Sequence, residues 1–355
     1  MLTAHDRVWA ALRGEMADRV PLTCYAGLLP QGAVERQLRD EGLALVNRLP
    51  VFSTDQPNVE TDHRAYRKDG VGYVRVTYRT PVGEVWHTYR TGGGYGTSLA
   101  VEFPIKGPED YGVIEFAIRD ERYAATYDDF LAARKRMGGD GAVIGNLGYS
   151  PLQHMLVILM GAERFALDMI ERPDLFFGLY ELLADRHREQ FTLCAESPAE
   201  AFIYGDNVTS EMVGLARFEQ YVVPRYNEFA SYLHPQGKLL GSHLDGKMAL
   251  LREAVARSEL DIIEAFAPFP DADLPLAEAR AAWPDKVIWL NYPSPVHLRP
   301  PEEVAAHTRQ MLADIAPGDR CLFGVTENIP DHVWERSMLT ISRVLREQGR
   351  LPLAR

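Results

Sequence analysis

The sequence predicts a (β/α)8 barrel, also called a TIM barrel, and three observations lead to this α/β fold class. Short apolar runs recur along the chain, and most are followed by a helical pattern, which is typical of a parallel sheet. Eight such runs are present, as a closed barrel of this type requires. The length of 355 residues suits a single barrel domain over residues 1–355 that carries an insertion.

The first predicted element is an amphipathic helix in MLTAHDRVWAALRG, where Thr3 is placed to cap the helix and Asp6 lies three residues on. A later helix is predicted after Pro173, because the leucines of PDLFFGLYELL fall on one helical face. Each predicted barrel strand ends in polar or small residues. The eight predicted strands are 20–25, 43–52, 143–147, 202–205, 238–242, 261–266, 287–291 and 320–326.

The stretch between the second and third strands breaks the alternation of strand and helix. Its segments YVRVTYRT and EVWHTYRT alternate like the arms of an antiparallel hairpin joined by Pro81, Val82 and Gly83. We therefore predict an insertion at about residues 54–140, folded over one end of the barrel. The glycine run at 92–96 is interpreted as a turn rather than a phosphate loop, because no nucleotide-binding motif surrounds it.

Composition and charge exclude several classes of function. The net charge of −12 argues against a nucleic-acid partner, since binding to phosphates relies on clustered Lys and Arg. The three cysteines, Cys24, Cys194 and Cys321, are too far apart for a CxxC motif and indicate a reducing compartment. No signal peptide or membrane-length apolar run is present, so we expect a cytoplasmic protein without a membrane partner.

Polar side chains gather where the predicted strands end, and in such a barrel these positions meet the substrate. His243 and Asp245 form an H-x-D pair whose side chains point the same way in an extended segment. With Glu327 they make a three-ligand set, which is typical of catalytic zinc, although iron and manganese also suit it. The alternative is a metal-free mouth in which His243 hydrogen-bonds Asp245 or Glu264.

Other residues at these strand ends are candidates for catalysis or cofactor binding. Asp206 and Glu211 follow the fourth strand, and Glu264 lies in the sixth, so these acids are candidate proton donors or acceptors. Tyr149 and Asn291 are candidate cofactor-binding residues near the ends of the third and seventh strands.

Several segments resemble the uroporphyrinogen decarboxylase superfamily, which also contains corrinoid-dependent methyltransferases. The likeness covers nearly the whole chain and is carried by six segments taken together. These segments are RVWAALRGEMADRVPL, ERPDLF, GDN, FEQYVVPRYNEF, GKLLGSHLDGK and FGVTENIP.

The same resemblance favours the methyltransferase branch. The decarboxylase carries an arginine-bearing segment after the first strand, whereas this chain has Cys24, Tyr25, Ala26 and Gly27 there. In the methyltransferases an H-x-C pair and a later Cys before an I-P dipeptide hold zinc. The resemblance places His243, Asp245 and Glu327 at those positions, so two carboxylates replace two thiolates and would make the metal a harder Lewis acid.

The resemblance thus implies a metal-assisted methyltransferase that passes a methyl group to or from a corrinoid protein, with an O-demethylase component as one form. Zinc is the expected divalent metal. Cobalamin is expected on the partner protein, because the chain has no corrinoid-binding signature. The expected partners are this corrinoid protein and a small methylated substrate, and a homodimer is left open. The alternatives are a cofactor-free decarboxylase acting on a small acid and a non-catalytic ligand-binding barrel.

Overall fold

The computed structural model describes residues 2–92 and 98–354, so most of the predicted glycine turn lies outside the described residues. The chain divides into two compact units. The first comprises residues 1–51, 127–148 and 198–355, and the second comprises residues 52–126 and 149–197. No helix within the described part of the chain combines the length and the apolar character needed to cross a membrane.

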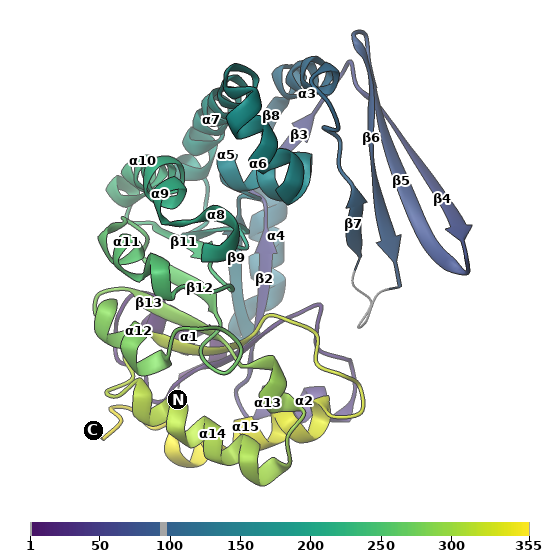
Figure 1. Cartoon of the computed structure of the whole chain (residues 1–355). Coiled ribbons are helices and arrows are strands. Elements are labelled where there is room, and N and C mark those ends of the chain that lie inside the picture. The colour runs from purple at the N-terminus through teal and green to yellow at the C-terminus, as the bar shows by residue number, and fades with distance from the viewer. Residues whose placement is uncertain (1, 93–97, 355) are drawn as a thin grey trace. The chain divides into compact units, whose positions relative to one another are not determined.

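The first unit contains a closed barrel of eight parallel strands, which confirms the predicted fold class (Figure 1). Each predicted strand overlaps an observed one. The strands are β1 (Leu22–Tyr25), β2 (Ala44–Leu49), β9 (Gly141–Asn146), β10 (Ala201–Tyr204), β11 (Leu239–His243), β12 (Ile262–Phe266), β13 (Val287–Asn291) and β14 (Cys321–Val325). Their order around the barrel is β1-β14-β13-β12-β11-β10-β9-β2, with β2 pairing back to β1.

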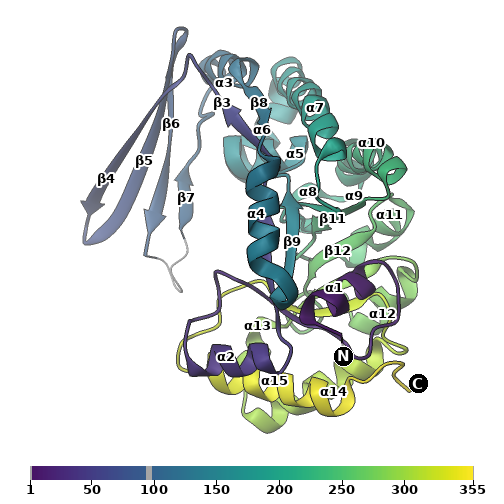
Figure 2. The same cartoon turned by 180° about the vertical axis from the view of Figure 1, so that it is seen from behind.

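Helices surround the barrel and one of them packs against its core. Helix α1 (Ala4–Leu12) begins with the predicted capping box between Thr3 and Asp6. It contributes buried side chains such as Val8 and Leu12 to the core inside the barrel. The remaining helices of this unit are α2 (Ala33–Asp40), α4 (Tyr127–Met137), α8 (Ser210–Val213), α9 (Leu215–Arg217), α10 (Val223–Leu233), α11 (Arg252–Arg257), α12 (Leu276–Ala282), α13 (Ser294–His297), α14 (Pro301–Asp314) and α15 (Trp334–Gln348). Figures 1 and 2 both show α15 lying beside α2 and α14.

The second unit contains antiparallel strands and its own helices. Its four-stranded sheet has the order β4-β5-β6-β7, and a separate pair joins β3 to β8. The predicted hairpin corresponds to β5 and β6, which pair from the turn at Thr80 and Gly83 onward. The strands are β3 (Phe52–Asp55), β4 (Glu60–Lys68), β5 (Val71–Thr80), β6 (Gly83–Thr91), β7 (Leu99–Glu102) and β8 (Arg122–Ala125). The helices are α3 (Glu109–Asp120), α5 (Pro151–Gln153), α6 (Gly161–Glu171) and α7 (Pro173–Glu196), with a π-helical segment at His154–Met160.

Candidate functional site

A layer of polar side chains faces the barrel interior at the C-terminal ends of the strands. The apolar core inside the barrel includes Val46, Ile144, Ile262 and Trp289. Side chains alternate along a strand, so the residues two positions further on point to the same side. These residues, with the last residues of β1 and β11, form what we call the mouth layer: Tyr25, Arg48, Asn146, His243, Glu264 and Asn291.

Glu264 lies at the centre of this layer and is only 1% exposed. The hydroxyl of Tyr25 donates to one carboxylate oxygen, and Nδ1 of His243 lies 2.6 Å from the other. The guanidinium of Arg48 lies 3.5 Å from that second oxygen. Burial by itself would raise the pKa of Glu264, but the charge and hydrogen bond of His243 and the charge of Arg48 lower it. Glu264 is therefore an ionised carboxylate with three partners.

Arg48 connects Glu264 to the neighbouring strands. Its Nη1 donates to the hydroxyl of Tyr25 at 2.9 Å, and its Nη2 donates to Oδ1 of Asn146 at 3.1 Å. Sequence reasoning did not single out Arg48. A signal was present, because Arg48 interrupts an apolar strand two positions after Val46 and so has to face the barrel interior.

The backbone of β12 is irregular directly after Glu264. Ala265 has a positive φ of 56°, a conformation that residues other than glycine rarely adopt. The register between β12 and β13 shifts between Ile263 and Phe266, as at a β-bulge. Bulges and strained residues of this kind gather at functional sites, where they redirect a side chain. The local backbone thus sets Glu264 opposite His243, its register partner on β11.

Both ring nitrogens of His243 face carboxylates. Nδ1 contacts Glu264, and Nε2 lies 3.5 Å from Oδ2 of Asp245. Burial on its own would lower the pKa of His243, but the charge of Glu264 and the hydrogen bonds to Asp245 and Glu264 raise it to about 10. Two carboxylates on opposite sides of the ring therefore favour a positive charge at this position.

The geometry around Nε2 fits two ligands of one metal ion. Two ligands of a tetrahedral ion, each bound at about 2.1 Å, lie about 3.4 Å apart. The separation between Nε2 of His243 and Oδ2 of Asp245 is close to this value, at 3.5 Å. The contact of Nδ1 with Glu264 matches the hydrogen bond by which a metal-bound histidine is oriented. Within residues 2–92 and 98–354, no three His, Cys, Asp or Glu side chains are grouped to hold a metal ion.

Glu327 lies in the loop after β14 and is exposed. One of its carboxylate oxygens accepts a hydrogen bond from Oγ of Ser294 at 2.9 Å. Glu327 also lines a hollow of about 250 Å³ together with Cys24 and Trp334. Its role as the third metal ligand stays a prediction.

Asp206 contacts the outer side of β11. It is fully buried, and its carboxylate accepts from the hydroxyl of Tyr226 at 2.5 Å and from Oγ of Ser242 at 3.4 Å. Ser242 precedes the inward-facing His243, so its side chain points away from the barrel interior, towards Tyr226 of α10. The structure thus places Asp206 between strand and helix and not in the mouth layer.

Two other candidates also lie outside the mouth layer. Glu211 is exposed on the short helix α8 and forms an ion pair with Lys247 at 2.5 Å. Tyr149 is half-buried and belongs to the second unit. The catalytic role of Glu211 and the cofactor-binding role of Tyr149 both stay predictions.

The placement of Asp206 predicts a structural role for the hydroxyl of Tyr226. We expect Tyr226→Phe to lower the free energy of unfolding by about 1–3 kcal/mol, because a buried carboxylate loses its closest donor. Tyr232→Phe, at an exposed position of the same helix, is the matched control and should change it little. Chemical denaturation of both variants tests this. Equal stability of the two variants would contradict the placement.

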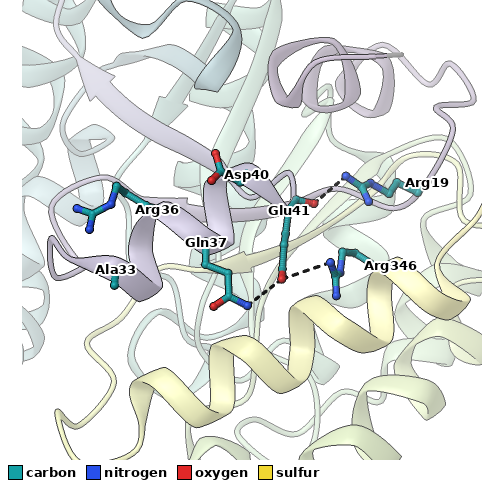
Figure 3. Close-up of a pocket in the computed structure, with 7 residues that line it drawn as sticks. All are labelled: Arg19, Ala33, Arg36, Gln37, Asp40, Glu41 and Arg346. Atoms are coloured by element: carbon teal, nitrogen blue, oxygen red, sulfur yellow. Dashed lines mark hydrogen bonds and ion pairs between the residues drawn. The ribbon is translucent and has the colours of Figure 1, made fainter.

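A further hollow of about 560 Å³ lies near the N-terminal ends of β1 and β2 (Figure 3). Arg346 of α15 lies 3.3 Å from the carboxylate of Glu41, and Gln37 of α2 donates to the same oxygen. The guanidinium of Arg19 donates to the carbonyl of Glu41 at 2.8 Å. In barrels of this type the N-terminal face contributes to stability and the C-terminal face carries catalysis. These contacts therefore tie α2 to α15 and are not part of the candidate active site.

A closed (β/α)8 barrel with ionised side chains at its C-terminal mouth is a fold on which many enzymes are built. Residues 95–340 match the family model of uroporphyrinogen decarboxylase (URO-D), and the chain belongs to this family. The predicted resemblance is thereby confirmed. No curated protein sequence matches the chain.

Solved structures with a similar fold include a methyltransferase from Methanosarcina mazei. It has a TM-score of 0.61 and 14% sequence identity, and the match covers 98% of this chain and 99% of that one. At this level of identity the likeness concerns the fold. A structure from Listeria monocytogenes, described as a candidate vitamin B12-independent methionine synthase, has a TM-score of 0.40 and 12% identity, covering 62% of this chain and 67% of that one.

Proposed function

We propose that this protein transfers a methyl group from a small methylated substrate to the cobalamin of a separate corrinoid protein, with His243 at the centre of the site. The observation that carries the proposal is the position of His243 between Glu264 and Asp245 at the barrel mouth. The description of the full-length structural neighbour as a methyltransferase supports methyl transfer over decarboxylation.

A divalent ion, with zinc as the proposed metal, would be held by Nε2 of His243 and by Asp245, with Glu327 as the proposed third ligand. Bound there, it would act as a Lewis acid towards an oxygen atom of the substrate. Glu264 accepts from Nδ1 and so directs Nε2 away from itself, towards the open side of the ring. Tyr25 and Arg48 keep Glu264 ionised and in place.

The reaction breaks the bond between the methyl carbon and the substrate oxygen. The electron pair of that bond stays on oxygen, while the methyl group bonds to the reduced cobalt of the corrinoid co-substrate, which supplies its own electron pair. The oxygen anion that forms is a poor leaving group unless positive charge or a proton compensates it. In the proposed site the divalent ion held by His243 and Asp245 would supply this positive charge.

A decarboxylase acting on a small acid is the second candidate, and the raised pKa of His243 favours it. A protonated His243 could donate its proton to the carbanion that forms when carbon dioxide leaves. Incubation with small carboxylic acids and measurement of released carbon dioxide would separate this candidate from methyl transfer.

The direct test follows methylation of cob(I)alamin spectroscopically with a panel of O-, N- and S-methyl donors. We expect methylation from at least one donor, and we expect Glu327→Gln to reduce the rate by about 100-fold or more if Glu327 is a ligand. Its thermal unfolding should be nearly unchanged, because Glu327 is exposed in a loop. Glu335→Gln, in the first turn of α15, is the matched control.

Two outcomes would count against these assignments. A metal-loaded protein that methylates no corrinoid with any donor would contradict methyl transfer. An unchanged rate in Glu327→Gln would remove Glu327 from the ligand set and leave His243 and Asp245 in it.

A further inference from the structure

Asn291 is a mouth-layer residue whose amide group has an unused donor. It is the last residue of β13 and is 1% exposed. Trp289, two residues earlier, belongs to the core inside the barrel, so the side chain of Asn291 faces the same interior. Its Nδ2 has no hydrogen-bond partner among the residues that the structure describes. A buried donor without a partner is unfavourable, which indicates that a ligand or water completes it.

The orientation of the amide is determined by its neighbour. Oδ1 of Asn291 accepts the backbone N–H of Thr326 at 3.1 Å. The opposite orientation would place the NH2 group against that N–H, so that two donors would face each other. Asn291 therefore presents a donor to the barrel interior. Oγ1 of Thr326 is also buried and also lacks a partner within the described ranges.

The two buried groups indicate what kind of ligand atom fits. The amide N–H of Asn291 needs an acceptor, and the hydroxyl of Thr326 can donate to the same kind of atom. An ammonium group, the form of a methylamine at neutral pH, offers only donors, and a thioether sulfur is a weak acceptor. An oxygen atom of the substrate, such as that of an ether or a carbonyl group, is the acceptor that suits both Asn291 and Thr326.

We infer that Asn291 and Thr326 bind an oxygen atom of the substrate and are the residues that make the site prefer an oxygen compound, such as an ether, over a methylammonium ion or a thioether. The inference rests on the proposed function only where it takes the bound compound to be the methyl donor. The binding of an oxygen acceptor by Asn291 is independent of it. Asn291 is thereby a specificity-determining residue.

The test compares binding of methyl aryl ethers with binding of the ethyl arenes in which a CH2 group replaces the ether oxygen. Affinities are measured by isothermal titration with the intact protein, without cobalamin. Wild-type protein should bind at least one ether about tenfold more tightly than its isostere, as one uncharged hydrogen bond provides. Asn291→Asp keeps the acceptor for Thr326 and loses the donor, so it should abolish the preference.

Asn227→Asp is the matched control, because Oδ1 of Asn227 also accepts a backbone N–H, from Glu259 at 2.9 Å, away from the mouth layer. It should keep the wild-type preference. If Asn291→Asp does not fold, Thr326→Val retains the backbone N–H and should weaken the preference instead. Equal affinities for every ether and its isostere in the wild type, as when only water fills the position, would overturn the inference. So would an unchanged preference in the folded Asn291→Asp or Thr326→Val protein.

These results are separable from the proposed function. An ether preference that depends on Asn291, in a protein that methylates no corrinoid, would support the inference and contradict methyl transfer. Methylation of cob(I)alamin, together with an ether preference that is unchanged in Asn291→Asp, would support methyl transfer and contradict the inference.

Discussion

His243→Asn should remove the bound divalent ion and reduce methyl transfer by about 10³-fold, the order of loss when one preorganised electrostatic contact is removed from an active site. The amide of asparagine can still donate to Glu264 in place of Nδ1, but it has no atom at the position of Nε2. The variant thus keeps the buried carboxylate partnered while losing the predicted ligand. His243→Ala would instead leave Glu264 without its charged histidine partner, which costs about 3–5 kcal/mol for a buried pair.

The measurement is elemental analysis of protein supplied with zinc, manganese or iron, alongside the cob(I)alamin assay. Wild-type protein should carry one ion per chain. His234→Asn is the matched control, because His234 also pairs with a carboxylate, Asp261 at 2.9 Å, but lies at the end of α10. Retention of stoichiometric metal by His243→Asn would show that the ion binds elsewhere.

The second large effect is expected for Glu264→Gln. The substitution preserves shape and removes the charge that orients His243, so it should weaken metal affinity or activity by about 10- to 100-fold. It should also leave Arg48 without its buried carboxylate. Competition with a chelator measures the affinity, and the assay with cob(I)alamin measures the rate.

Glu259→Gln, three residues before β12, is the control and should behave as the wild type. A Glu264→Gln protein with wild-type metal affinity and rate would mean that Glu264 only maintains the fold. Loss of stability without loss of affinity or rate would lead to the same conclusion.

The barrel could be predicted from the sequence because its strands are buried on both faces. A strand such as 287–291 is a continuous apolar run with a polar last residue, and this pattern can be recognised in the sequence without knowing which strands lie beside it. Strand β4 could not be predicted in the same way. Nearly all of its side chains are exposed, so it shows no apolar period that would distinguish it from a loop.

The candidate site was predictable where it depends on strand ends. His243, Asp245 and Glu264 follow from their positions at the ends of two adjacent strands, and the register places His243 opposite Glu264. The direction in which the side chain of Asp206 points was not predictable, because the alternation of side chains along a strand does not continue into the turn after β10. Its contact with Tyr226 also depends on a helix that comes later in the chain. Loop residues such as Glu327 have no periodicity that would set their position.

The most direct test of the central claim is anomalous diffraction from crystals of zinc-loaded protein, recorded on both sides of the zinc absorption edge. The account predicts one anomalous peak about 2.1 Å from Nε2 of His243, with a carboxylate oxygen of Asp245 at a similar distance. The peak should be absent in His243→Asn crystals grown under the same conditions. A fully occupied zinc peak away from His243, or a zinc-loaded crystal in which Nε2 still faces only Asp245, would contradict it.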